Sequence, residues 1–354
     1  MGNKVNIGVI GAGNIGTRHL NSYKEVADAN IIEICDILPE RLAEKAAQFN
    51  VPKTCLDYHE MLANPEIDAV DICLPNYLHA PVAIDAFAAG KHVMLEKPMA
   101  LNAQLGMDIC AARDKAGKLL QMGMVRRQEN LAQLVREEIS QGRLGEIYQI
   151  DIRQIRRRGI PGMGGWFTTK EQSGGGALID IAVHSFDLAL WATNYWNPTR
   201  VSARTYSKFG APMRDYKYVS MWAGPPNYNG TFDVDDFTSG FVRFENYATM
   251  SFEVAWAANA EPSNTIDFLG TKGGIHLGQT DSDLVIRTEQ NGRLVDVKPL
   301  LPKQDDIFAR ELRKFVGAIN GENEIPATGE QGVMDMKLID AIYRSSNQNQ
   351  EVEI

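Results

Sequence analysis

The sequence predicts two domains, a doubly wound α/β domain followed by an α+β domain with a mainly antiparallel sheet. The chain has 354 residues, which is more than one hydrophobic core usually supports. Over residues 4–125, short apolar runs alternate with helix-period stretches, as in a parallel sheet with helices on both faces. Over residues 201–297, apolar side chains alternate with period two. We therefore place the domains at residues 1–125 and 126–354.

The first domain has the pattern of a parallel sheet. Its expected strands are residues 4–10, 31–35, 69–74, 92–95 and 119–123. Helices are clearest at residues 41–49 and 82–89, the second closed by Gly90 as a C-cap. Ligands of such sheets bind beyond the carboxyl ends of the strands, so the residues that follow each strand are the candidates for binding.

The second domain combines helices with the period-two strands. It begins with a helix over residues 131–141 and an extended stretch over 146–157. A strongly apolar helix follows at 177–191. The last two helices, expected at 307–319 and 332–345, come after the sheet and can pack back on the first domain.

One connection stands out by its length. Residues 206–231 contain Gly224-Pro225-Pro226 and four tyrosines. This stretch is too long for a hairpin turn, so we interpret it as a functional loop or lid.

Composition and charge exclude several classes of protein. With 44% hydrophobic and 23% charged residues, the chain is neither collagen-like nor largely disordered. The 36 basic and 45 acidic residues give a net charge of −9, which argues against a nucleic-acid partner. We find no apolar run near the roughly 20 residues that span a bilayer, so we expect no membrane partner and a cytoplasmic location. The four cysteines form no CxxC pair and are expected to be reduced thiols.

A glycine-rich motif follows the first strand and opens a helix: Gly11-Ala12-Gly13-Asn14-Ile15-Gly16. Gly11 permits a tight turn, Gly13 lets the backbone approach a pyrophosphate, and Gly16 lets the helix pack close to the strand. The amides of Asn14 and Ile15 would face the phosphates, with the positive end of the helix behind them.

Asp36 lies 20 residues beyond Gly16, at the end of the next strand, where a carboxylate can accept both ribose hydroxyl hydrogens. The alternative is that Asp36 only caps the helix entered through Pro39. A carboxylate at position 36 would repel a 2′-phosphate, and no basic residue follows it before Arg41. We therefore expect NAD rather than NADP as the cofactor.

Two further groups of residues suggest chemistry. Glu96-Lys97-Pro98 closes a strand, where an ammonium could stabilise an alkoxide, although a surface Glu-Lys pair is an equal alternative. In the apolar helix, Asp180, His184 and Asp187 share one face at i, i+4 and i+7.

Burying carboxylates is costly unless they are paired or face a polar cavity, so the stripe on the apolar helix should line a site. Its histidine suits proton transfer with a hydroxyl at neutral pH. A satisfied buried ion pair or half of a metal site are the alternatives. We expect no metal, because the other histidines form no second ligand pair with suitable spacing. The glycines at 174–176 would let a substrate or cofactor ring approach the backbone.

Taken together and in order, these residues resemble the Gfo/Idh/MocA oxidoreductases, which include glucose-fructose oxidoreductase and inositol dehydrogenases. The resemblance covers nearly the whole chain. It rests on the glycine motif, Asp36, Pro75-Asn76 with His79, Glu96-Lys97-Pro98, Gly174-Gly175-Gly176 to Asp180 and His184, Asp235-Asp236-Phe237, and Thr328-Gly329-Glu330 before Tyr343 and Ser345.

The resemblance implies a Rossmann domain, an open-faced, mainly antiparallel sheet, and a homodimer or homotetramer formed through that sheet. It implies that Lys97, Asp180 and His184 are the catalytic trio. The implied NAD-binding residues are Gly11, Gly13, Asn14, Ile15, Gly16, Asp36, Leu74, Asn76, His79, Glu96, Lys97 and Trp166. The implied substrate-binding residues are Lys97, Arg126, Arg156, Asp180 and His184, with Arg127, Arg153, Arg157 and Arg158 as further candidates.

The function predicted on this basis is the NAD-dependent oxidation of a secondary hydroxyl of a cyclitol, sugar or glycoside. His184 would remove the hydroxyl proton, Lys97 would stabilise the alkoxide, and Asp180 would orient the substrate and Lys97. Alternatives are an NAD-dependent glycosidase that uses transient oxidation, a reductase of a ketone or imine outside sugar chemistry, and a non-catalytic dinucleotide-binding regulator.

Overall fold

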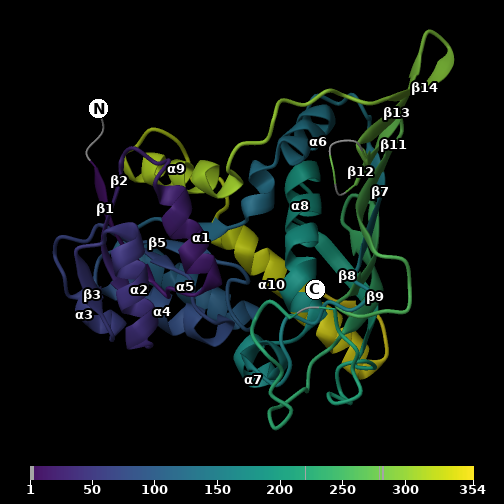
Figure 1. Cartoon of the computed structure of the whole chain (residues 1–354). Coiled ribbons are helices and arrows are strands. Elements are labelled where there is room, and N and C mark those ends of the chain that lie inside the picture. The colour runs from purple at the N-terminus through teal and green to yellow at the C-terminus, as the bar shows by residue number, and fades with distance from the viewer. Residues whose placement is uncertain (1–3, 220, 279, 281–282) are drawn as a thin grey trace. The chain divides into compact units, whose positions relative to one another are not determined.

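The computed structural model describes residues 4–219, 221–278, 280 and 283–354 (Figure 1). The chain divides into two compact units, which we describe separately. The first unit comprises Met1–Gln128 and Gln304–Val333, and the second comprises Glu129–Lys303 and Met334–Ile354. A segment near the C-terminus is thus part of the N-terminal unit.

The first unit is built on a six-stranded sheet in the order β3-β2-β1-β4-β5-β6, in which every pairing is parallel. The strands are β1 (Val5–Ile10), β2 (Ala29–Cys35), β3 (Lys53–Cys55), β4 (Ala69–Ile72), β5 (His92–Glu96) and β6 (Leu120–Gly123). This confirms the predicted doubly wound α/β domain. β3 was not predicted because it has three residues, two of them exposed, and no apolar run.

The helices of the first unit are α1 (Asn14–Tyr23), α2 (Pro39–Phe49), α3 (Tyr58–Leu62), α4 (His79–Ala88), α5 (Ala103–Ala116) and α9 (Ile307–Ile319). α9 begins at its predicted position because the side chain of Asp306 accepts the N–H groups of Phe308 and Ala309. Leu312 and Phe315 of α9 join the buried cluster around β1, which explains why this late helix belongs to the first unit.

The second unit contains a nine-stranded sheet in the order β14-β13-β12-β11-β7-β10-β9-β8-β15. The strands are β7 (Ile147–Ile155), β8 (Pro198–Tyr206), β9 (Phe237–Phe244), β10 (Thr249–Ala255), β11 (Ser263–Gly270), β12 (Gly273–Leu277), β13 (Val285–Gln290), β14 (Arg293–Val297) and β15 (Val352–Glu353). β7 and β10 pair in parallel and the other pairings are antiparallel, which confirms the mainly antiparallel sheet.

The other elements of the second unit are mostly helical. They are α6 (Asn130–Ser140), α7 (Lys170–Ser173), a π-helical turn (Leu178–Ala182), α8 (Val183–Thr193) and α10 (Gly329–Gln348), whose first residues belong to the first unit. The sequence predicted one continuous helix over 177–191. The structure instead places a π-helical turn directly before α8, and such turns are frequent at functional sites.

One stretch, Lys170–Thr193, is long and apolar enough to cross a membrane, contrary to the expectation that no run approaches that length. In the folded chain, 94% of its apolar window is buried. This is the burial of a helix inside a protein core, where an all-round apolar surface is also required.

The long connection between β8 and β9 forms neither helix nor strand over residues 207–219 and 221–236. Its two ends are tied together, because Oδ2 of Asp236 accepts the N–H groups of Lys208, Phe209 and Gly210 at 2.8, 2.6 and 2.9 Å. Its middle is tied to the segment after β7, through hydrogen bonds such as Ala223 N–H to Pro161 O at 2.9 Å. The described parts of the loop are therefore held both at its ends and near its middle.

Candidate functional site

The glycine-rich motif joins β1 to α1, and the absence of a side chain has a different geometric consequence at each of its three glycines. Gly11 has φ +98°, and a Cβ there would lie 2.4 Å from a carbonyl oxygen that follows β4. A Cβ on Gly16 would lie 1.9 Å from the carbonyl oxygen of Gly11. A Cβ on Gly13 would meet no atom within 4 Å. α1 begins with Asn14 and Ile15, and the open approach at Gly13 fits a dinucleotide pyrophosphate.

Asp36 lies directly after β2 and is buried. Its Oδ2 accepts the N–H of Ala12 in the glycine-rich motif at 2.9 Å, and its Oδ1 accepts the N–H of Leu38 at 2.9 Å. Asp36 thus holds the glycine-rich loop and the residue before α2, while its predicted contact with a ribose stays a prediction. Arg41 lies 3.3 Å from Oδ2, a pairing that the sequence alone did not indicate.

Leu74 and Asn76 lie in the connection after β4, and His79 is the first residue of α4. His79 joins two turns, with Nε2 2.8 Å from the carbonyl oxygen of Leu74 and Nδ1 2.7 Å from that of Pro98. Burial lowers the pKa of His79, so it is mainly neutral near pH 7. The predicted nicotinamide-side residues after β4 and β5 are therefore linked to each other through one buried ring.

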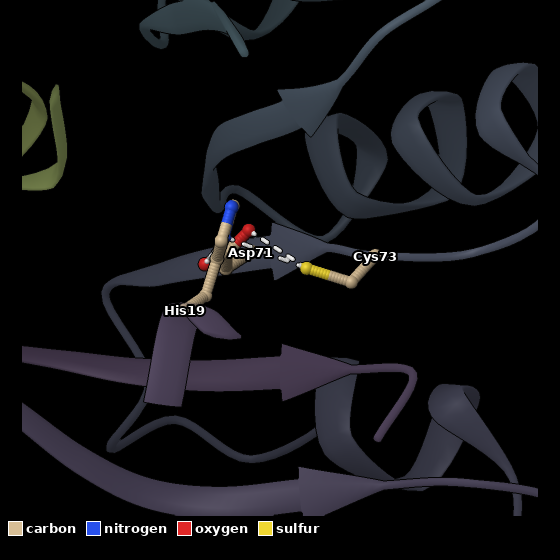
Figure 2. Close-up of side chains that lie close together, drawn as sticks. All are labelled: His19, Asp71 and Cys73. Carbon is tan, nitrogen blue, oxygen red and sulfur yellow. Dashed lines mark hydrogen bonds and ion pairs between the residues drawn. The ribbon is translucent and has the colours of Figure 1, made fainter. Parts of the chain in front are cut away.

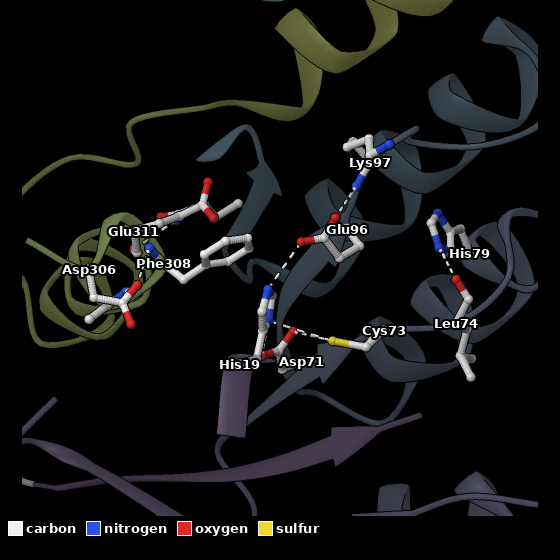
Figure 3. Close-up of polar contacts among 12 residues, drawn as sticks. His19, Asp71, Cys73, Leu74, His79, Glu96, Lys97, Asp306, Phe308 and Glu311 are labelled. Atoms are coloured by element: carbon white, nitrogen blue, oxygen red, sulfur yellow. Dashed lines mark hydrogen bonds and ion pairs between the residues drawn. The ribbon is translucent and has the colours of Figure 1, made fainter. Parts of the chain in front are cut away.

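Glu96 ends β5 and Lys97 follows it. The backbone N–H of Lys97 donates to Oε2 of Glu96 at 3.1 Å, and Oε1 of Glu96 forms an ion pair with Nε2 of His19 at 3.1 Å (Figure 3). His19 lies on α1, and its Nδ1 is 2.8 Å from Oδ2 of Asp71 on β4. This network has no signal in the sequence, where the histidines other than His184 show only that their spacing does not suit a metal.

The same network includes Cys73, whose Sγ lies 3.5 Å from both Nδ1 of His19 and Oδ1 of Asp71 (Figure 2). The donor atoms of these three residues are close enough together to be considered as metal ligands. Burial, with Asp71 adding to it, raises the pKa of the Cys73 thiol to about 12. A protonated thiol is a poor metal ligand, so a hydrogen-bond network is the better interpretation.

The two arginines after β6 have different surroundings. Arg127 is buried, and its Nη1 donates to the carbonyl oxygen of Pro326 at 2.7 Å and to Oε1 of Gln331 at 2.8 Å. Its prediction as a substrate contact is therefore wrong, because its guanidinium ties together two parts of the first unit. Arg126 is half-buried and stays a candidate for substrate binding.

In the second unit, Asp180 lies in the π-helical turn and His184 in the first turn of α8. Oδ2 of Asp180 accepts a hydrogen bond from Nε1 of Trp256 at 2.9 Å, and both residues are buried. Over residues 175–193, every residue except His184 is buried. Asp187, the third member of the predicted stripe, is buried with the rest, so His184 is the accessible group on this helix.

The start of this helical segment is fixed by Asp235. Its Oδ1 accepts the N–H of Gly176 at 2.8 Å and the hydroxyl of Tyr343 at 2.6 Å, and its Oδ2 accepts the N–H of Leu178 at 2.9 Å. Burial raises the pKa of Asp235. A Cβ on Gly176 would lie 1.8 Å from the carbonyl oxygen of Asp235, and one on Gly175 1.9 Å from the Tyr343 hydroxyl.

The expectation that the glycines at 174–176 open the backbone to a ligand is therefore wrong for Gly175 and Gly176. Each is small because another part of the second unit packs directly against it. Asp235 and Tyr343 appeared in the sequence only as parts of the family resemblance, and the structure shows what they do.

Trp166 begins a 3₁₀ turn (Trp166–Thr168), and Thr168 at its end hydrogen-bonds to Thr231 and Asp233 of the long loop. Its ring stacks on Phe167 with a centroid distance of 3.7 Å, and Phe167 meets Trp222 of the loop edge-on at 5.1 Å. Trp222 is 56% exposed. These three rings form one group, which we call the aromatic cluster.

The other predicted arginines lie along and after β7. Arg153 forms an ion pair with Glu253 at 3.1 Å, and Arg158 donates to Oδ1 of Asn259 at 2.7 Å. Arg157 is exposed and Arg156 is half-buried. Arg156 thus remains the candidate for substrate contact in this group.

Comparison with known proteins gives two family matches. Residues 5–124 match the oxidoreductase family with an NAD-binding Rossmann fold, and residues 132–276 match the GFO/IDH/MocA C-terminal domain. Among curated relatives, D-glucoside 3-dehydrogenase of Escherichia coli (strain K12) is 29% identical over 98% of this chain and 97% of its own. Myo-inositol 2-dehydrogenase of Thermotoga maritima is 26% identical over 98% of each chain.

Among solved structures, levoglucosan dehydrogenase in complex with NADH and levoglucosan has a TM-score of 0.87 at 24% identity. The match covers 99% of this chain and 100% of that chain. An oxidoreductase domain protein from Kribbella flavida also has a TM-score of 0.87, at 22% identity over 99% of both chains. At these identities the structural matches establish the fold.

Proposed function

Because the chain belongs to the GFO/IDH/MocA oxidoreductase family and contains its NAD-binding Rossmann domain, we propose that it oxidises a secondary hydroxyl of a sugar glycoside with NAD. The observation that carries this proposal is the difference in burial between His184 and the rest of the helical segment that contains Asp180. In a segment that is otherwise buried, only His184 is half-buried, and it lies one turn from a carboxylate that a buried indole holds in place.

The proposed reaction assigns one task to each of three side chains. His184 accepts the proton of the substrate hydroxyl, Asp180 orients the substrate, and Lys97 stabilises the negative charge on the alkoxide oxygen. Bound NAD supplies the acceptor for the hydride that leaves the carbon. The alcohol thus becomes a ketone as its proton goes to His184.

The cofactor assignment agrees with the geometry of the first unit. The open approach at Gly13 and the N-terminus of α1 fit a pyrophosphate, and the Asp36 carboxylate stands where a ribose binds. NAD is favoured over NADP because that carboxylate repels a 2′-phosphate. Arg41 lies beside Asp36, so this preference depends on the carboxylate more than on the absence of a basic group.

A glycoside is favoured over a cyclitol by the aromatic cluster. The rings of Trp166, Phe167 and Trp222 offer flat apolar surface, which suits the apolar face of a sugar or of an aromatic aglycone. The similarity to D-glucoside 3-dehydrogenase supports the same class of substrate, and that to myo-inositol 2-dehydrogenase supports the cyclitol as the second choice.

The test is a screen for NAD reduction by the purified enzyme. The panel contains inositols, hexoses, disaccharides and phenolic glycosides, each repeated with NADP. We expect the highest kcat/KM with a glycoside and NAD. Release of nitrophenol from a nitrophenyl glycoside without net NADH formation would instead show an NAD-dependent glycosidase, and no turnover of any polyol would favour a non-catalytic role.

A further inference from the structure

We propose that His19 is a positioning residue for the reaction, since it holds the Glu96 carboxylate and, through it, the turn that carries Lys97. This inference rests on the proposed function, in which Lys97 stabilises the alkoxide. It gives a catalytic purpose to a buried histidine that lies on the helix behind the phosphate loop rather than in the loop itself.

His19 is placed to hold two neighbouring strands at once. Its side chain is fully buried, and both ring nitrogens are engaged, Nδ1 with Asp71 of β4 at 2.8 Å and Nε2 with Glu96 of β5 at 3.1 Å. The ring of Phe308 lies at 5.5 Å from the imidazole ring. Nδ1 hydrogen-bonds to Asp71 and Nε2 adds an ion pair with Glu96, so His19 connects α1 to β4 and to the end of β5 (Figure 3).

Glu96 transmits this link to Lys97. Its Oε1 faces His19, while its Oε2 accepts the backbone N–H of Lys97 at 3.1 Å. A Cβ on Gly123 of β6 would lie only 3.0 Å from Oε1, so the space for the carboxylate depends on a glycine there. Glu96 is therefore confined on three sides, by an imidazole, by the next peptide and by a neighbouring strand.

The turn Glu96-Lys97-Pro98 is held from a second direction by His79. Nδ1 of His79 lies 2.7 Å from the carbonyl oxygen of Pro98. One histidine thus fixes the residue before Lys97 and another fixes the residue after it. Such support on both sides is what a catalytic group needs if its position is to be held within a fraction of an ångström.

The charges around His19 favour the same interpretation. Burial lowers the pKa of His19, but Asp71 and Cys73 outweigh this effect and raise the pKa well above its usual value. Burial, with Glu96 adding to it, raises the pKa of Glu311, the carboxyl group that faces this network from α9. A cationic imidazole therefore lies between Asp71 and Glu96. A neutral side chain at position 19 would leave both carboxylates without a neighbouring positive charge.

The experiment is a double-mutant cycle between His19 and Lys97, read as the single-turnover rate of NAD reduction with the best glycoside of the screen. We expect His19→Gln to lower the rate about tenfold in the wild-type background and less than about twofold in the Lys97→Ala background. Equal losses in both backgrounds would overturn the proposal, because a merely structural effect does not depend on Lys97.

Two additional variants keep the test decisive. If His19→Gln does not fold, Asp71→Asn takes its place, since it weakens the hold on His19 while preserving the shape of the side chain. Its loss should also disappear in the Lys97→Ala background, and a loss that persists there refutes the proposal. His276→Gln is the control, because His276 forms a 2.8 Å pair with Asp267 in the sheet of the second unit and should leave the rate unchanged.

The cycle also separates this inference from the proposed function. If Lys97→Ala alone retains the wild-type rate, the assigned role of Lys97 fails, and the role of His19 fails with it. If Lys97→Ala is impaired but His19→Gln in the wild-type background is not, the proposed function stands and only the inference about His19 is wrong. Titration of NADH binding and thermal melting confirm that each variant is folded.

Discussion

The indole N–H of Trp256 donates a 2.9 Å hydrogen bond to Oδ2 of Asp180, and both side chains are buried. Trp256 follows directly after β10, whereas Asp180 lies in the π-helical turn before α8. The sheet of the second unit therefore fixes the carboxylate that we propose to orient the substrate. This contact joins residues 76 positions apart in the sequence.

Replacing Trp256 with Phe tests this contact. The substitution keeps an apolar ring but removes the donor, and a buried acceptor that loses its donor costs about 1–3 kcal/mol. We expect kcat to fall about tenfold while NADH binding stays within a factor of about two. Trp191→Phe is the control, because Trp191 lies on α8 against Arg136. Equal losses of kcat in the two variants would show that the hydrogen bond to Asp180 is not the cause.

Replacing Asp36 with Ser should weaken NAD binding and admit NADP. The carboxylate that repels a 2′-phosphate is lost, and Arg41, 3.3 Å from Oδ2 of Asp36, becomes available to the phosphate. Hydrogen bonds to charged groups contribute about 1.5–3 kcal/mol, and the variant loses those between the Asp36 carboxylate and the ribose hydroxyls. We therefore expect KM for NAD to rise at least about tenfold. In the double variant with Arg41→Ala, NADP should again be poorly used. An Asp36→Ser variant that keeps the wild-type preference for NAD contradicts the assignment.

Replacing Trp222 with Ala tests the aromatic cluster. Aromatic stacking contributes about 0.5–1.5 kcal/mol beyond area burial, so kcat/KM for a phenyl glycoside should fall about threefold to tenfold. A methyl glycoside of the same sugar should change by less than about twofold, because it has no ring to stack. Tyr247→Ala is the control, since Tyr247 is an exposed aromatic residue in the turn between β9 and β10. Equal losses of kcat/KM for the two glycosides would show that the aromatic cluster does not recognise the phenyl group.

Replacing Glu311 with Gln should stabilise the protein at neutral and higher pH. Burial and the neighbouring Glu96 raise the pKa of Glu311 well above its usual value, so the unfolded chain loses this proton at a lower pH than the folded chain does. The folded protein therefore loses stability as the pH rises from the pKa of Glu311 in the unfolded chain, near 4.3, towards its higher pKa in the folded protein.

The Tm of the Glu311→Gln variant should thus exceed that of the wild type at pH 8, by about 2–4 °C for each kcal/mol gained. The difference should shrink as pH falls towards 5. Glu324→Gln, at an exposed position, should show no such trend. A difference in Tm that does not change with pH would contradict the assigned titration of Glu311.

Much of the fold and part of the site could be predicted because the signals are local. The spacing of Gly11, Gly13 and Gly16, the position of Lys97 after a strand, and the shared face of Asp180 and His184 can each be read from a short window. The short strand β3 and the π-helical turn were missed, since neither has a distinct pattern in the sequence.

The supporting contacts could not be predicted, because each joins distant segments. Asp235 caps the start of the helical segment from 59 residues away at Gly176, and His19 meets Asp71 from 52 residues away. The only signal for His19 in the sequence is its position three residues after Gly16, which places it on the same side of the helix as that buried glycine. The partners of His19 lie on β4 and β5, which the sheet order places side by side.

The most direct test of the proposed function is the rate of NADH formation with a glycoside, compared between the wild type and His184→Ala. General base catalysis contributes about 10²–10⁴-fold, so kcat should fall at least about a hundredfold while NADH binding stays nearly unchanged. A His184→Ala variant that turns over every substrate of the panel at the wild-type rate would contradict the assignment of His184 as the base.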